Sequence, residues 1–337
     1  MKHQYSIRSG ALDGYEARVT ALGGHAEKLL SACGLCLQDL EHPDTLIPFT
    51  SMVSLLELTA ERLECPDFGL QLGFNQNVNA LGNLGLLMLN CQTAREALII
   101  AQRYIAVHSQ AEYWRLHEAG NLAFVERFAV SIDVSHARQF KELSFAVCLK
   151  LIKTIIKGAV KIERLELAHA PISAKHVYKK MFECDVIFNQ EHDRLVVNRE
   201  YLDYSLSAPS STAKQALESQ LSQLAIQHHD LERQVTTIIL QTLGFQAVSI
   251  DTVASIMNIH KRTLQRMLKV QGLSFKTLLK NIRIKTACWH LEASKIDLTL
   301  LSELLGYSDV SAFSKAFKQE KGISPLQWRK SKRTDLG

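Results

Sequence analysis

Two short stretches of the chain carry basic and polar side chains at helical spacing, with no carboxylate among them. The first is "NIHKRTLQRMLKV" (258–270) and the second is "VSAFSKAFK" (310–318). In each stretch these side chains recur at i, i+3, i+4 and i+7, which places them on one face of a helix. The two stripes are Arg262, Gln265, Arg266 and Lys269, and Ser311, Ser314, Lys315 and Lys318.

The chemistry of these stripes suits the major groove of duplex DNA. Arginine can donate two parallel hydrogen bonds to guanine, glutamine can pair with adenine, and lysine or serine can contact phosphates. A single basic stripe could also be an ordinary solvated helix face, but two copies in phase favour DNA. We expect the DNA-binding residues to be His260, Lys261, Arg262, Gln265, Arg266, Lys269, Val310, Ser311, Ser314, Lys315 and Lys318.

The stripes belong to an internal repeat. Residues 253–274 and 301–324 each read as a short helix, a turn of three or four residues and a second helix, which is a helix-turn-helix. Ala254 is small where the two helices of the first copy would cross. The expected inward residues are Leu264, Met267 and Leu268 in the first copy, and Phe313, Ala316 and Phe317 in the second.

The turns of the repeat carry residues that suit a left-handed backbone. Asn258 stands at the first turn and Gly306 at the second, and these are the residue types that adopt positive φ most easily. Ser308 or Asp309 can then cap the helix that follows. The sequence therefore predicts two complete helix-turn-helix units.

Charge is segregated along the chain. Of 39 Lys and Arg and 34 Asp and Glu, residues 251–337 hold 16 and 7, a net charge of +9. Residues 1–250 hold the remaining 23 and 27, a net charge of −4. This asymmetry indicates a C-terminal region that meets a polyanion, joined to a body with another role.

The body is expected to be α+β. "FKELSFAVCLKLIKTIIKG" (140–158) has the apolar spacing of an amphipathic helix that packs on a sheet, and its apolar side could form the wall of a pocket. "KIERLELAHA" (161–170) alternates as a half-buried strand does. "VIFNQEHDRLVV" (186–197) reads as two strands around a polar turn, and residues 111–130 offer another hairpin, turning at Gly120-Asn121.

The expected fold is an α+β N-terminal sensor domain followed by an all-α DNA-binding domain with two helix-turn-helix motifs. The small residues and proline of "SAPSS" give way to a polar, helix-prone stretch, as in a linker that enters a new helix. We place the N-terminal domain at 1–205, the linker at 206–228 and the DNA-binding domain at 229–337, and the family resemblance described below implies that the first of these binds an effector and dimerises.

The C-terminal segment resembles the DNA-binding domain of the AraC/XylS transcription regulators. The resemblance rests on "VASIMNIHKRTLQRMLKVQG", on "RIKTACWHLEAS" with Arg283, Ala287 and Leu291, and on "LLGYSDVSAFSKAFKQEKGISPLQWR" with Arg329. It implies that a joining helix over 275–293 sets the two second helices into successive major grooves.

The sequence departs from the pattern of the resembled family at two positions. His260 stands where a serine usually caps the first recognition helix, so that the cap is weaker or His260 itself contacts a phosphate. Ser302 replaces the usual alanine at a helix crossing in the second unit. Neither change threatens the fold.

The body resembles the N-terminal effector-binding and dimerisation domain of one branch of these regulators. Its motifs are "PDFGLQLG", "LGNLGLLMLN", "AREALIIAQRY" and "VIFNQEHDRLVV", within about residues 10–205. The resemblance implies a transcriptional activator whose partners are double-stranded promoter DNA, RNA polymerase, a small-molecule effector and a second copy of the chain. It names no effector, and a body that only dimerises is the alternative.

Three further clusters have both a functional and a structural interpretation. Cys33 and Cys36 have the spacing of a redox or zinc pair, but no second pair accompanies them, and a structural role is favoured. The run His228-His229-Asp230 could bind a metal, but solvated polar residues are expected there. The asparagines of "FNQNVNALGNLG" (74–85) could line a pocket or turn the chain, and we favour the turn.

Other classes of protein find no support in the sequence. We find no GxSxG, phosphate-binding glycine loop or HExxH, so we expect no enzyme and no cofactor. The uncharged run 68–94 is rich in Asn and Gly, which argues against a membrane span, and the N-terminus lacks a signal-peptide pattern. Seven cysteines, an odd number, fit free thiols in the cytoplasm.

Overall fold

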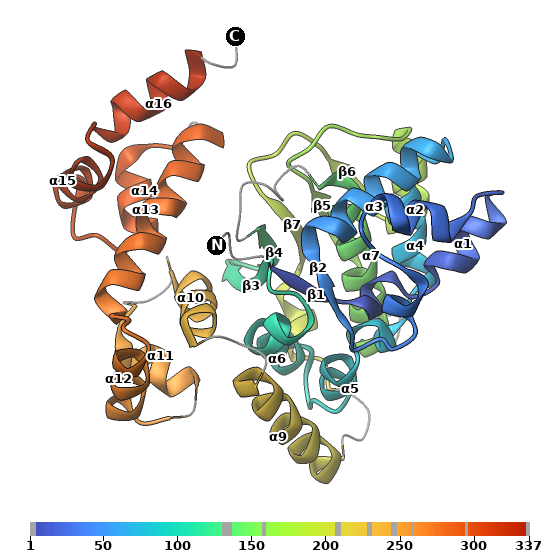
Figure 1. Cartoon of the computed structure of the whole chain (residues 1–337), viewed down its shortest axis with the longest axis horizontal. Helices are drawn as coiled ribbons and strands as arrows, with labels where there is room; N and C mark the ends of the chain where they lie inside the picture. The colour runs from blue at the N-terminus through green and yellow to red at the C-terminus, as the bar shows by residue number, and fades with distance from the viewer. Residues whose placement is uncertain are drawn as a thin grey trace. The chain divides into compact units, whose positions relative to one another are not determined.

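The computed structural model describes residues 5–129, 137–156, 160–205, 210–227, 231–243, 248–257, 259–293 and 296–334. The chain divides into two compact units, Met1–His228 and His229–Gly337. The first unit combines helices with sheets and the second is helical (Figure 1). The expected fold class, α+β followed by all-α, is confirmed.

The first unit begins with a two-stranded sheet and a group of helices. Buried side chains between Ile7 and Leu72 form most of one hydrophobic core, which includes Tyr15, Phe49 and Phe68, all 1% exposed or less. The elements are β1 (Ser6–Arg8), η1 (Ser9–Leu12), α1 (Tyr15–Ala21), α2 (Ala26–Ala32), η2 (Leu37–Leu40), β2 (Leu46–Pro48), α3 (Phe49–Arg62), α4 (Phe68–Asn75), η3 (Val78–Leu81), α5 (Asn83–Leu89) and α6 (Ala94–His108).

A five-stranded sheet follows, in the order β3-β4-β7-β5-β6. The β5–β6 pair is parallel and the other pairs are antiparallel. The elements are β3 (Glu112–Ala119), β4 (Leu122–Ala129), α7 (Arg138–Ile155), β5 (Ile162–Glu166), α8 (Lys175–Phe182), β6 (Asp185–Ile187), β7 (Asp193–Asn198), η5 (Arg199–Asp203) and α9 (Ser211–Gln227).

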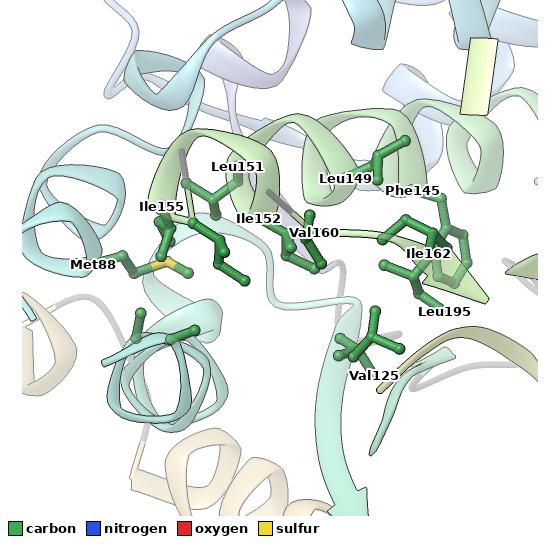
Figure 2. Packing of buried hydrophobic residues seen from close by; sticks show 14 of the residues in the cluster. Met88, Val125, Phe145, Leu149, Leu151, Ile152, Ile155, Val160, Ile162 and Leu195 are labelled. Atoms are coloured by element: carbon green, nitrogen blue, oxygen red, sulfur yellow. The ribbon is translucent and has the colours of Figure 1, made fainter. Parts of the chain in front are cut away.

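Two of the expected features of the sheet are confirmed. β3 and β4 form the hairpin, and Gly120 has φ +59° at its turn, a backbone conformation that glycine adopts without strain. The amphipathic helix is α7, whose Phe145 and Leu149 share a buried cluster with Val125, Ile162 and Leu195 of the sheet. Figure 2 shows these side chains on α7 and on the strands near it.

The expected pairing within residues 186–197 is wrong. Both strands exist, as β6 and β7, but β5 lies between them in the sheet, so they do not form a hairpin. β7 instead pairs with β4 and β5 through antiparallel ladders, and β6 is an edge strand. The polar turn between them therefore crosses over β5 and does not close a hairpin.

Helix α9 lies in the region that we expected to be a linker, and it belongs to the first unit. It packs against α5 and α6. Leu221 of α9 is 1% exposed and belongs to the same buried cluster as Phe145 and Leu149 of α7. Tyr104 Oη of α6 lies 3.0 Å from Ser222 Oγ of α9. An ion pair of 3.3 Å joins Arg103 to Glu218. The structural division thus falls after α9, and the functional boundaries at 205 and 228 stay a proposal.

The second unit is built from seven helices within its described residues. Its main hydrophobic cluster gathers Ala287, Leu291, Leu301, Phe313 and Phe317, each fully buried. The helices are α10 (Leu231–Thr242), α11 (Ile250–Ile256), α12 (Lys261–Val270), α13 (Phe275–Ala293), α14 (Leu298–Leu304), α15 (Val310–Lys321) and α16 (Pro325–Thr334). No helix in the described ranges has the length and apolar character that crossing a bilayer requires.

Candidate nucleic-acid interface

The first helix-turn-helix is formed by α11 and α12. Val253 and Ala254 of α11 are buried, as are Leu264 and Leu268 of α12, so the two helices meet through small and branched apolar side chains. Met267, which we also expected to face inward, is half-buried. The packing leaves the opposite side of α12 free of core contacts. Asn258, expected at the turn, lies outside the described residues.

His260 is the N-cap of α12. Its Nδ1 accepts a hydrogen bond of 3.2 Å from the backbone N–H of Arg262, so the imidazole takes the place of the usual cap hydroxyl. This acceptor role requires the neutral ring with its proton on Nε2. The side chain is exposed, which leaves Nε2–H able to donate to a phosphate.

The first predicted stripe is exposed along its length. Arg262, Gln265, Arg266 and Lys269 are all exposed on α12. Lys261 differs, because it is half-buried and its Nζ lies 2.7 Å from Asp251 Oδ2 of α11. That ion pair is on the surface, where such pairs contribute little to stability, so a phosphate could compete for Lys261.

The second helix-turn-helix is formed by α14 and α15. Gly306 has φ +68° at the turn, as expected, and Asp309 caps α15 by accepting a hydrogen bond of 2.7 Å from the N–H of Ala312. Ser308 does not cap the helix but donates a hydrogen bond of 3.0 Å to Asp309. Ser302 is 1% exposed and its Oγ donates to the carbonyl of Thr299 at 2.8 Å, so the buried hydroxyl is satisfied.

The second predicted stripe is exposed at three of its four positions. Ser311, Lys315 and Lys318 are exposed on α15, whereas Ser314 is half-buried. Val310, at the start of the helix, is also half-buried. The residues expected behind the stripe are buried or half-buried: Phe313, Phe317 and Ala316.

Helix α13 joins the two helix-turn-helix motifs and is tied to the second of them. Arg283 donates a hydrogen bond of 2.8 Å from Nη2 to the carbonyl of Gly306, and its guanidinium lies 4.9 Å from the centre of the Tyr307 ring. Figure 1 shows α12 near one end of α13 and α15 near the other. The 19 residues of α13 span roughly 28 Å at about 1.5 Å per residue, close to the rise of one turn of DNA, about 34 Å.

The remaining candidates from the sequence have local structural roles or fall outside the described residues. Cys33 follows α2 and Cys36 precedes η2, where its N–H and thiol both donate to Asp39, and all seven cysteines are free. Asn77 caps η3 through a hydrogen bond of 2.8 Å from the N–H of Asn79, which supports the turn interpretation. His228, His229 and Asp230 lie outside the described residues.

The first unit contains a cavity, of which the sequence indicated only one wall. Its volume is about 90 Å³. Residues from α5, α6, α7 and the sheet line it. The apolar side of α7 was expected to supply such a wall, and Leu151, Ile152 and Ile155 of this helix do so, together with Ile156 directly after it. Figure 2 shows part of this wall, with Met88 of α5 beside it.

Two family models match the chain, and together they cover most of it. Residues 23–206 match the model described as the arabinose-binding domain of AraC transcription regulators, N-terminal. Residues 253–331 match a helix-turn-helix domain. These matches fall on the first unit and on the two helix-turn-helix motifs. The chain therefore belongs to the AraC family of DNA-binding transcription regulators.

Two relatives with named functions agree with this assignment. The chain is 27% identical over 332 residues to the HTH-type transcriptional regulator VirS of Mycobacterium tuberculosis, covering 96% of each chain. It is 24% identical over 318 residues to the ornithine utilization regulator of Pseudomonas aeruginosa, covering 93% of each chain. Among solved structures, the regulator CdpR of Pseudomonas aeruginosa matches 90% of this chain and 96% of its own, at 18% identity and a TM-score of 0.47.

Proposed function

We propose that this regulator binds promoter DNA sequence-specifically in the cytoplasm and activates transcription under the control of a small-molecule effector. The effector binds the first unit, and the second unit contacts DNA through α12 and α15. Contact with RNA polymerase and assembly as a homodimer belong to the same proposal. The chain needs no cofactor for this role and is not an enzyme.

One observation carries the DNA-binding part of the proposal. Each helix-turn-helix buries one side of its second helix in its own core and leaves an acid-free basic and polar stripe on the other side. A solvated helix face gains nothing from excluding carboxylates, whereas a surface that meets phosphates does. The repetition of this arrangement at both ends of α13 supports recognition of two successive major grooves.

The effector part of the proposal is supported by the cavity and by its neighbour α9. Helix α6 supplies Ala101 and Ile105 to the cavity wall, and its Arg103 and Tyr104 contact α9. A ligand that moves α6 would therefore move α9, which ends at Gln227, two residues before the second unit begins in the sequence. A ligand shifts such an equilibrium only by its difference in affinity between the two states.

Substitutions on α12 test the assignment of the stripe. On a duplex selected from a random library, Arg262→Ala or Gln265→Ala is expected to cost about 1–3 kcal/mol and to relax the preference at one or two base pairs. Lys269→Ala is expected to weaken binding to all sequences alike, because a phosphate contact carries no sequence information. The measurement is a titration of each variant with selected and scrambled duplexes.

The matched control is Lys28→Ala, an exposed lysine on α2 of the first unit, which should leave DNA binding unchanged. Equal losses on selected and scrambled DNA for both Arg262→Ala and Gln265→Ala would assign the whole stripe to phosphates. Unchanged binding by all three α12 variants would remove this helix from the interface.

A first unit that only dimerises is the second candidate function. It differs from a sensor in one measurable respect, since a ligand that binds the folded state raises thermal stability by mass action. The cavity favours the sensor, because a module that only dimerises has no need for it.

A further inference from the structure

The wall of the cavity in the first unit is mostly apolar. Among its described lining residues there is no asparagine, lysine or aspartate. Aliphatic and aromatic side chains from helices and from the sheet enclose most of the space, among them Leu84, Leu98, Ile105, Trp114 and Val125. The predominant contact that this wall offers a ligand is therefore hydrophobic.

Two charged side chains, Glu112 and Arg115, are among the described residues that line the cavity, and each already has a partner of opposite charge. Glu112 Oε2 accepts a hydrogen bond of 2.5 Å from Arg127 Nε, and Arg115 Nη2 lies 2.7 Å from Glu126 Oε2. A charged ligand would therefore enter an apolar space that offers it no uncompensated charge. Such burial is costly, because an ion loses its hydration without gaining a partner.

The amide of Gln76 supplies the first polar group of the wall. Gln76 is 2% exposed, and its Nε2 donates to the carbonyls of Ala11 and Asp13 at 2.9 and 3.0 Å. These bonds fix the orientation of the amide and leave Oε1 as a buried acceptor without a partner in the described part of the chain. An unmet buried acceptor of this kind destabilises the fold, and a ligand that donates a hydrogen bond to it would remove that cost.

His108 supplies the complementary donor. Arg8 Nη1, which can only donate, lies 3.5 Å from His108 Nδ1, and so the ring proton is assigned to Nε2. Burial, together with the charge of Arg8, lowers the pKa of His108 to about 3, so the ring is neutral at physiological pH.

The two polar side chains are connected through η1 and η3. Gln76 donates to the carbonyl of Ala11 in η1, and Arg8, beside His108, donates to the carbonyl of Ala80 in η3. Because η1 packs against η3, and Ala11 and Ala80 both line the cavity with Gln76 and His108, the donor and the acceptor border the same part of the wall.

We propose that this cavity binds a neutral, predominantly apolar small molecule with one hydroxyl group, which accepts a hydrogen bond from Nε2–H of His108 and donates one to Oε1 of Gln76. The inference rests on the proposed sensor function and names the class of its effector. A sugar is not expected to bind, since a mostly apolar wall would desolvate its several hydroxyls without giving each of them a hydrogen bond. A charged amino acid does not fit, since the wall offers no free counter-charge.

The test uses the full-length protein and four small molecules. We expect p-cresol to bind saturably in calorimetry and to raise the melting temperature, because it combines an apolar ring with one hydroxyl. Toluene lacks only the hydroxyl and should bind roughly tenfold more weakly, the loss expected when hydrogen bonds of modest net value disappear. L-arabinose and L-ornithine should not bind.

Two pairs of variants locate the binding. Ala101→Leu adds bulk on the cavity face of α6 and should abolish binding of p-cresol, whereas Ala106→Leu makes the same change on α6 away from the lining and should not. His108→Leu should bind p-cresol no better than toluene, and His108→Gln, which keeps a neutral donor, should recover part of the difference. Melting of each variant without ligand checks that it folds.

Different outcomes would contradict the inference and the proposed function. Absence of p-cresol binding to the wild type, or binding that Ala101→Leu leaves intact, would overturn the inference. Binding of arabinose or ornithine that Ala101→Leu abolishes would keep the cavity as the effector site and overturn the ligand class. Binding of p-cresol as predicted, with no change in DNA occupancy or reporter output, would keep the inference and contradict effector control.

Discussion

Raising the salt concentration about fourfold, from roughly 50 to 200 mM, is expected to weaken DNA binding by the full-length protein about 500-fold. The figure follows from the exposed basic side chains of the two stripes, Arg262, Arg266, Lys269, Lys315 and Lys318. Each phosphate that such a side chain neutralises releases a counterion and contributes about −0.9 to the slope of log affinity against log salt. One contact for each of these side chains gives a slope of about −4.5.

The salt slope can be divided between the two helices. Lys269→Ala on α12 and Lys318→Ala on α15 should each reduce the slope by about 0.9, and the double variant should reduce it by about 1.8. Lys28→Ala in the first unit should leave the slope unchanged. A slope near zero, or one that Lys269→Ala and Lys318→Ala leave untouched, would show that these stripes do not meet the phosphates.

Replacing Phe317 by alanine is expected to destabilise the second unit by about 3–5 kcal/mol. Phe317 is fully buried, and its ring centre lies 5.8 Å from that of Phe313 and 5.9 Å from that of Trp328. Its loss leaves a cavity behind α15, so the melting temperature and DNA binding should fall together. Domains have only about 5–15 kcal/mol of stability, so the change removes a large share of it.

The control for this substitution is Leu326→Ala on α16, because Leu326 is 61% exposed. Its effect should stay within about 0.5 kcal/mol. Urea unfolding followed by circular dichroism measures both variants. A loss below about 1 kcal/mol for Phe317→Ala would mean that the side chains around α15 are not closely packed.

The helix-turn-helix motifs could be predicted because their determinants are local. Gly306 at positive φ, Asp309 as N-cap and the spacing of Phe313 and Phe317 all lie within a dozen residues. His260 could be recognised as a departure, but only the structure shows that Nδ1 performs the capping. Periodicity also distinguished the exposed stripe of α12 from its buried side.

The sheet order and the cavity could not be predicted in the same way. Alternation identifies a strand but not its partner. The sequence therefore suggests that β6 and β7 pair with each other, whereas in the structure β5 lies between them. The polar groups of the cavity involve Arg8, Gln76 and His108, which lie up to 100 positions apart in the sequence. Nothing local to any of them indicates that they border the same space.

The central claim is that α12 and α15 read two successive major grooves in a sequence-specific way. Selection of duplexes from a random library by the full-length protein tests it most directly. We predict two enriched blocks whose centres lie about 10 to 10.5 base pairs apart, with Arg262→Ala and Gln265→Ala relaxing one block and leaving the other intact. Enrichment of no sequence, or of a single block that α12 variants do not alter, would contradict the claim.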